Sequence, residues 1–219
     1  MSLESQLVIL AATGRKLVQN GLVRGSGGNV SLRWGELCYV SPTGAALDRL
    51  SAADFVPLKI EGTNTWQLQR ASSESAMHLA CYRARPDVQA VFHVHPPNCI
   101  ALGCAGLGLR ALTPDFYLAM GRDVPLLPYV TPTTLALADR VGALMAQHDA
   151  VLLRNHGLIL GAASVEEALA NSLIAEEAAR MVLLAHAATG TCSALSDKEI
   201  DELERVTGRY RRRRDEPAG

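Results

Sequence analysis

The sequence predicts an α/β protein in which a central sheet is covered by helices. Segments with apolar residues at helical spacing alternate with shorter segments rich in β-branched residues, which are typical of strands. The 219 residues are 48% hydrophobic and 20% charged, as in an average globular protein. No internal repeat is visible. We therefore expect one domain spanning residues 1–219.

The N-terminal segment predicts a helix followed by a hairpin. Residues 3–20 carry apolar side chains near helical spacing, and Gly21 is placed to end the helix. A glycine-rich turn at 25–29 precedes alternating apolar residues at 30–32 and 37–40, which predict two strands.

The next segment predicts a turn, two strands and a helix. Ser41-Pro42-Thr43-Gly44 is a turn sequence, and residues 55–69 are expected to form two short strands. Ser72 and Ser73 precede a helix predicted over 74–85, so Glu74 is expected in its first turn.

The central segment predicts buried strands around one helix. Residues 88–94 are apolar and β-branched, and further strands are expected at 124–129, 150–153 and 158–160. A helix is expected at 133–147.

Two capping boxes open the last helices. Ser164-x-x-Glu167 predicts a long helix to about Ala188, and Ser196-x-x-Glu199 predicts another to about Tyr210.

Charge and composition exclude several classes of protein. The net charge is −1, and the basic run Arg211–Arg214 is confined to the tail, so we expect no nucleic-acid partner. No stretch reaches the roughly 18 apolar residues that span a bilayer, and Glu4 stands where a signal peptide needs positive charge. We expect a soluble cytoplasmic protein whose five cysteines are reduced.

Three histidines form the strongest chemical signal. His93 and His95 are two apart on a predicted strand, so their side chains share a face and can bind one metal ion. His156 lies in Arg154-Asn155-His156-Gly157, which interrupts an apolar strand where an unpaired ring would be costly. We predict that these three residues bind a divalent metal.

Glu74 is the candidate base. A carboxylate near a bound cation can bind that cation or take a proton. His78 follows one turn later on the same helix face and is interpreted as a core residue or as one behind the metal ligands.

Three short loops predict an anion site. Gly25–Asn29, Thr43-Gly44 and Ser72-Ser73 are rich in hydroxyl and backbone N–H groups, and the last opens a helix. Together they favour a phosphate ligand.

These residues, in this order, resemble the class II aldolase and adducin-head family, and within it the L-fuculose-phosphate aldolases. The matching motifs are GSGGNVSLR at 25–33, SPTG at 41–44, SSE at 72–74, HVH at 93–95 and RNHGLIL at 154–160.

The resemblance implies an α/β/α fold with a mostly antiparallel sheet, and a homotetramer. It implies one Zn²⁺ per subunit on His93, His95 and His156 with Glu74 as fourth ligand or base; Mn²⁺ or Co²⁺ would also suit such a site. It places the phosphate of a sugar substrate against six residues: Gly28, Asn29, Thr43, Gly44, Ser72 and Ser73.

The implied activity is cleavage of a phosphorylated ketose to dihydroxyacetone phosphate and an aldehyde through a zinc-stabilised enediolate. The acid that serves the aldehyde oxygen is expected to be Tyr117, Asp115 or Tyr210. The alternatives are an epimerase, decarboxylase or dehydratase acting on a related sugar phosphate, or a non-catalytic adducin-like interaction module.

Overall fold

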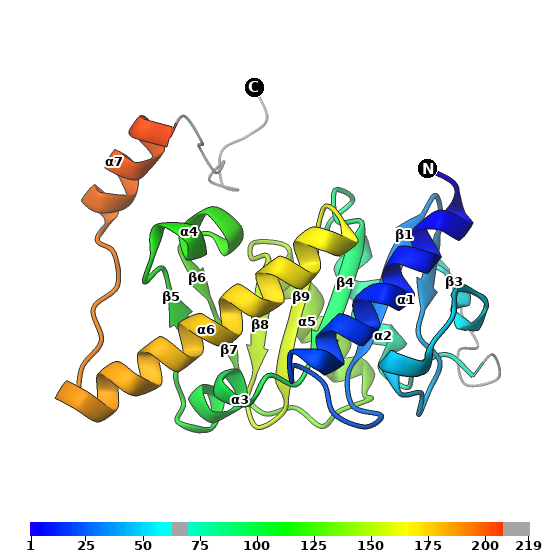
Figure 1. The fold of residues 1–219 in the computed structure, drawn as a ribbon, viewed down its shortest axis with the longest axis horizontal. Coiled ribbons are helices and arrows are strands. Elements are labelled where there is room, and N and C mark those ends of the chain that lie inside the picture. Colours follow the sequence, from blue (N-terminus) through cyan, green and yellow to red (C-terminus); the bar gives the residue numbers. More distant parts are fainter. Residues whose placement is uncertain (63–69, 208–219) are drawn as a thin grey trace.

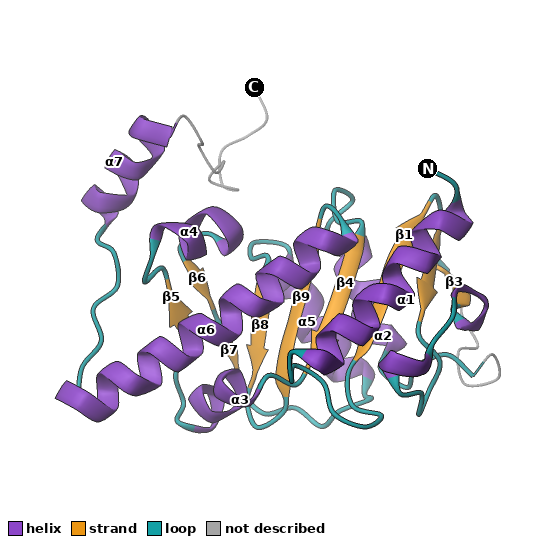
Figure 2. Cartoon of the chain, viewed as in Figure 1, coloured by secondary structure: helices purple, strands orange, loops and turns teal. Residues whose placement is uncertain are grey.

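The strands form a mixed sheet between layers of helices in the computed structural model, which describes residues 1–62 and 70–207 (Figure 2). Within those residues the main sheet has seven strands in the order β3-β2-β1-β4-β9-β8-β7. Their bounds are β1 Asn29–Trp34, β2 Leu37–Val40, β3 Val56–Lys59, β4 Ala90–Val94, β7 Leu126–Leu127, β8 Ala150–Leu153 and β9 Gly157–Ala162. Neighbouring strands are antiparallel except β7 and β8. The predicted fold class is confirmed.

Helices cover both faces of this sheet (Figure 1). One face packs against α1 (Leu3–Gln19), α3 (Pro97–Cys104) and α6 (Val165–Thr189), and the other against α2 (Ser75–Ala84) and α5 (Leu135–Met145). Two short 3-10 helices, Leu47–Arg49 and Ala52–Asp54, connect β2 to β3.

A smaller unit lies beside β7. Its two strands, β5 (Leu109–Arg110) and β6 (Asp123–Val124), pair with each other, and α4 (Pro114–Met120) connects them. The last described helix, α7 (Asp197–Thr207), follows a linker after α6 and contacts α4 (Figure 1).

Side chains of β4 alternate between two hydrophobic cores. Phe92 and Val94 belong to the core under α1 and α6, whereas Val91 belongs to the core under α2 and α5. Because the side-chain period of a strand is two, His93 is on the α2 side of the sheet. This parity directs a fully buried imidazole toward the start of α2.

The sequence-based elements agree with the structure except at a few places. The strand expected at 124–129 is split into β6 and β7 at Pro125, which has no N–H for a ladder. The helices α3 and α4 were not predicted. The second strand expected within 55–69, Tyr210 and Arg211–Arg214 lie outside the described residues.

Across residues 1–62 and 70–207, the apolar stretches of the helices are all too short or too charged to cross a bilayer.

Candidate metal and anion site

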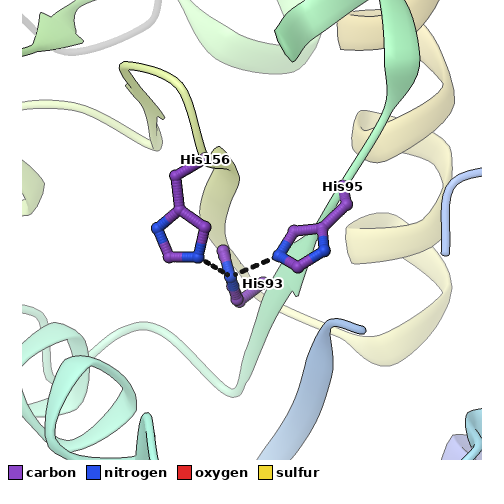
Figure 3. Close-up of side chains that lie close together, drawn as sticks. All are labelled: His93, His95 and His156. Carbon is purple, nitrogen blue, oxygen red and sulfur yellow. Dashed lines mark hydrogen bonds between the residues drawn. The ribbon is translucent and has the colours of Figure 1, made fainter. Parts of the chain in front are cut away.

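Three imidazole rings converge at one end of the sheet (Figure 3). His93 is in β4, His95 follows that strand directly, and His156 lies in the turn between β8 and β9. The Nε2 atom of His93 is 3.0 Å from Nε2 of His95 and 3.2 Å from Nε2 of His156. The structure therefore brings the three predicted ligands together.

The backbone around His156 explains how it reaches the other two rings. The sequence suggested a strand interrupted by a polar segment, but residues 154–156 form a hairpin turn between antiparallel β8 and β9, with Asn155 in the left-handed region at φ 57°. A Cβ on Gly157 would lie 2.5 Å from the Val94 carbonyl oxygen and 2.8 Å from the His95 ring. Gly157 thus allows β9 to approach the histidines closely.

Glu74 completes the cluster from the α2 side. Its Oε2 is 3.2 Å from His93 Nε2, and its Oε1 is 3.4 Å from His156 Nε2. The expected place in the first helical turn is wrong by one residue: Glu74 is the N-cap of α2, and its carboxylate makes no capping hydrogen bond. The backbone N–H is instead donated to the Ser72 hydroxyl, which leaves the carboxylate directed at the imidazoles.

The charge state of Glu74 suits a ligand or a base. Burial alone would raise its pKa, but hydrogen bonds from His93 and Asn29, together with attraction to the His93 and His156 rings when protonated, hold the pKa well below its usual range. Glu74 is therefore a carboxylate at neutral pH.

The ring nitrogens are also suited to a cation. Burial, followed by the charge of His93, lowers the pKa of both His95 and His156 to about 4, so both rings are neutral at pH 7. His93 Nδ1 lies 3.1 Å from the Leu158 carbonyl oxygen, which would accept an N–H on Nδ1 when a cation occupies Nε2.

These atoms fit a divalent metal. Tetrahedral zinc with bonds of 2.0–2.1 Å separates its ligands by about 3.3 Å. The four contacts given above are close to this value, and the ligand atoms of the three histidines all lie within 4.8 Å of one another. Glu74 Oε1 and His156 Nδ1 are buried, and neither atom has a hydrogen-bond partner among the described residues. Converging lone pairs around a buried carboxylate are stabilised by a cation.

The predicted anion loops meet at the same end of the sheet. Pro42 forms an isolated antiparallel bridge with Ala71, and the Ser72 N–H donates to the Ser41 carbonyl oxygen. The Ser41 hydroxyl also accepts the Val30 N–H, which connects the glycine-rich turn to the other two loops. Thr43, Gly44 and Ser73 are exposed, whereas Ser72 is buried.

Residues of the glycine-rich turn lie directly against the proposed metal site. Gly28 has φ 69°, and a Cβ there would lie 2.9 Å from the His93 carbonyl oxygen. Asn29 is buried and donates a side-chain N–H to Glu74 over 3.1 Å. The predicted anion loop is therefore continuous with the predicted metal site.

Sequence reasoning placed His78 in the core or behind the metal ligands, but it missed Ser31, Tyr82 and the hydrogen bonds that join them to Asn29. The side-chain oxygen Oδ1 of Asn29 is 2.6 Å from Nε2 of His78. Nδ1 of His78 is 2.7 Å from the Ser31 hydroxyl, which lies 2.8 Å from the Tyr82 hydroxyl. The signal was present as spacing: Asn29 and Ser31 share a face of β1, and Glu74, His78 and Tyr82 repeat every four residues.

Of the residues proposed as the acid for the aldehyde oxygen, the two that the structure describes, Tyr117 and Asp115, are not part of this cluster. Tyr117 is buried in α4, and its hydroxyl donates to Glu204 of α7. Asp115 is exposed at the start of α4.

Comparison with known proteins identifies relatives over most of the chain. Residues 8–183 match the family model described as class II aldolase and adducin N-terminal domain. A 5-deoxy-D-ribulose 1-phosphate aldolase of Bacillus thuringiensis is 36% identical, over 81% of this chain and 82% of the relative. A 3-oxo-tetronate 4-phosphate decarboxylase of Haemophilus influenzae is 28% identical, over 91% and 96%. The solved structure of an L-fuculose 1-phosphate aldolase, 29% identical, superposes with a TM-score of 0.83 over 95% of this chain and 98% of that chain.

Proposed function

The chain belongs to the family of class II aldolases and adducin N-terminal domains, and on that premise we propose that it is a metal-dependent aldehyde-lyase. The proposed substrate is a phosphorylated ketose of the L-fuculose 1-phosphate type, and the products are dihydroxyacetone phosphate and an aldehyde. The two aldolase relatives support this class, since each is named as an aldolase of a sugar 1-phosphate.

One observation carries the proposal: a buried carboxylate lies among three histidines and next to three hydroxyl- and N–H-rich loops. A divalent ion held by His93, His95, His156 and Glu74, most simply zinc, would supply a Lewis acid for negative charge on a substrate oxygen. Glu74 takes the proton from the carbon beside the ketone in the condensation direction and returns it on cleavage.

The loops supply the binding energy for the phosphate. We assign this role to Gly28, Asn29, Thr43, Gly44, Ser72 and Ser73, whose backbone N–H, amide and hydroxyl groups suit an anion. Tyr117, Asp115 and Tyr210 are the candidates for the acid at the aldehyde oxygen. We further propose a homotetramer, which native mass spectrometry would test.

The role of Glu74 is tested by measuring substrate proton exchange in the Glu74→Gln variant. With dihydroxyacetone phosphate in deuterated buffer, wild type should exchange the proton beside the ketone, and Glu74→Gln should not, because Gln is similar in size but cannot accept the proton. Glu36→Gln, in the exposed turn after β1, is the matched control. Wild-type exchange by Glu74→Gln would remove Glu74 as the base.

A decarboxylase is the second candidate, and the match to the 3-oxo-tetronate 4-phosphate decarboxylase favours it. Carbon dioxide release from a phosphorylated 3-oxo acid, without aldehyde release from ketose 1-phosphates, would replace the first proposal with this one. The cluster of His93, His95, His156 and Glu74 argues against a non-catalytic adducin-like module.

A further inference from the structure

A line of buried hydrogen bonds runs from Glu74 into the core between β1 and α2. It passes through Asn29, His78, Ser31 and Tyr82, and each of these four side chains is at most 6% exposed. Buried polar groups in folded proteins form hydrogen bonds, so each bond along this line needs one donor and one acceptor, which can be assigned.

The assignment starts at the carboxylate. Glu74 can only accept, so the Asn29 atom facing it must be the amide nitrogen and the atom facing His78 must be the carbonyl oxygen. His78 Nε2 therefore carries the proton. Burial, with the charge of His93 second, lowers the pKa of His78 to about 3, so the ring is neutral and has one N–H.

The remaining bonds follow in the same direction. Since His78 Nδ1 is then an acceptor, the Ser31 hydroxyl must donate to it, and the Tyr82 hydroxyl must donate to Ser31. Every bond thus points toward Glu74. An amide does not pass protons in its ordinary form, so the line orients groups and does not transfer protons.

We propose that His78 is a positioning residue for the reaction at Glu74: its Nε2–H fixes the Asn29 amide so that an N–H, and not the carbonyl oxygen, faces the carboxylate. A flipped amide would set two acceptors against each other and turn Glu74 away from the histidines. The catalytic consequence rests on the proposed function, whereas the orientation of Asn29 does not.

A pair of amide variants tests the role. The amide nitrogen of Gln can occupy the place of His78 Nε2, whereas Asn reaches only the place of Nδ1. At saturating substrate, His78→Asn and His78→Leu should exchange the substrate proton more slowly by on the order of tenfold, while His78→Gln retains most of the rate. Metal content and Tm are measured alongside. Equal rates for Gln and Asn, or a wild-type rate for Leu, would overturn the role.

A second measurement needs no substrate. Proton–nitrogen correlation spectra of zinc-loaded protein with ¹⁵N-labelled histidine give the tautomer of His78, whose signals are identified by their loss in His78→Gln. We expect the Nε2–H tautomer at neutral pH; the Nδ1–H tautomer would overturn the orientation of Asn29. This result decides the structural claim even if wild type cleaves no sugar phosphate, or if His78→Asn or His78→Leu fails to fold.

Discussion

Ser72 and Ser73 are neighbours in the chain but differ in their surroundings. Ser72 is buried and accepts the Glu74 N–H, so its hydroxyl supports the start of α2. Ser73 is exposed at the same loop, beside the turn that contains Thr43. Ser73 is therefore the better hydroxyl with which to test the phosphate proposal, because its replacement disturbs less of the protein.

Ser73→Ala should lower kcat/KM for a phosphorylated ketose tenfold to a hundredfold. A hydrogen bond to a charged group contributes about 1.5 to 3 kcal/mol, and binding energy at the phosphate also orients the reacting carbon. The unphosphorylated sugar should be affected little. Both substrates are compared at constant zinc; an equal penalty for the two would show that Ser73 does not bind the phosphate.

His78 should make the metal-free protein sensitive to acid. Its pKa is about 3 in the folded protein and near 6.5 when unfolded, so as pH falls below 6.5 the unfolded chain takes up a proton that the folded chain refuses. The charged and titratable groups around it are Glu74, His93 and, through Ser31, Tyr82. Between pH 6.5 and about pH 3, the contribution of His78 should lower the free energy of unfolding by up to about 1.4 kcal/mol for each unit that the pH falls.

Urea unfolding in the presence of a chelator measures this effect. The comparison is wild type with His78→Gln, which leaves the other histidines in place. The slope of stability against pH below 6.5 should be smaller in the variant, and identical slopes would contradict the low pKa of His78.

At the scale of elements, the hairpin of β8 and β9 places His156 against β4. β4 and β9 are paired antiparallel, with Val94 opposite Leu158, one residue beyond Gly157. A methyl group at Gly157 would meet the Val94 backbone, which cannot move without disturbing that ladder. The position of the proposed metal ligands thus depends on a residue that carries no side chain.

Gly157→Ala should weaken metal binding and cost about 1 to 3 kcal/mol of stability, because overpacking forces β4 and β9 apart. Gly161→Ala on the same strand is the control: its Cβ would lie 3.0 Å from Val88 methyl groups and 3.1 Å from the Met145 methyl, away from the histidines. Zinc affinity by competition with a chelator should fall only for Gly157→Ala. An equal loss of zinc affinity in both variants would show that the effect comes from any substitution in β9 and not from the contact between Gly157 and Val94.

The elements found from sequence are those with a long periodic pattern or a clear cap. Ser164 caps α6 as predicted. At the start of α7, the Ser196 N–H donates to the Glu199 carboxylate, and the Glu199 N–H donates to the Ser196 hydroxyl. Short α3 and α4 were missed because each has a proline in its first turn, and proline also ends the preceding strand or loop.

The convergence of the histidines could be predicted in part, because imidazoles two apart on a strand must share a face. The line behind Asn29 was not predicted, because its bonds join residues 45 to 51 positions apart and depend on how α2 packs on β1. Spacing shows which side chains share a face of one element, but the partner across the core is set by tertiary packing.

At the scale of the whole molecule, α7 is attached by one buried apolar residue, Ile200, and by polar contacts near α4. Arg122 forms ion pairs with Asp197 and Asp201, and the Tyr117 hydroxyl donates to Glu204. Ion pairs this exposed contribute little to stability. The sheet with its two helical layers therefore supplies most of the buried apolar surface, and α7 depends on it.

The proposed metal site connects three distant parts of this fold, since its candidate ligands come from the start of α2, the end of β4 and the turn between β8 and β9. An ion that binds only when these parts are assembled stabilises the folded state by mass action. Free zinc at a hundred times its dissociation constant should add about 2.7 kcal/mol to the free energy of unfolding.

For a chain of this length that gain raises Tm by about 5 to 11 °C, measured by calorimetry on chelator-treated protein before and after zinc is restored. His95→Ala is the control, because two histidines and a carboxylate do not hold the geometry of the full site. It should show reduced zinc content, low activity and only a small rise in Tm. A wild-type Tm that does not respond to zinc, or a His95→Ala variant with full metal occupancy, would mean that the converging imidazoles are not the metal site.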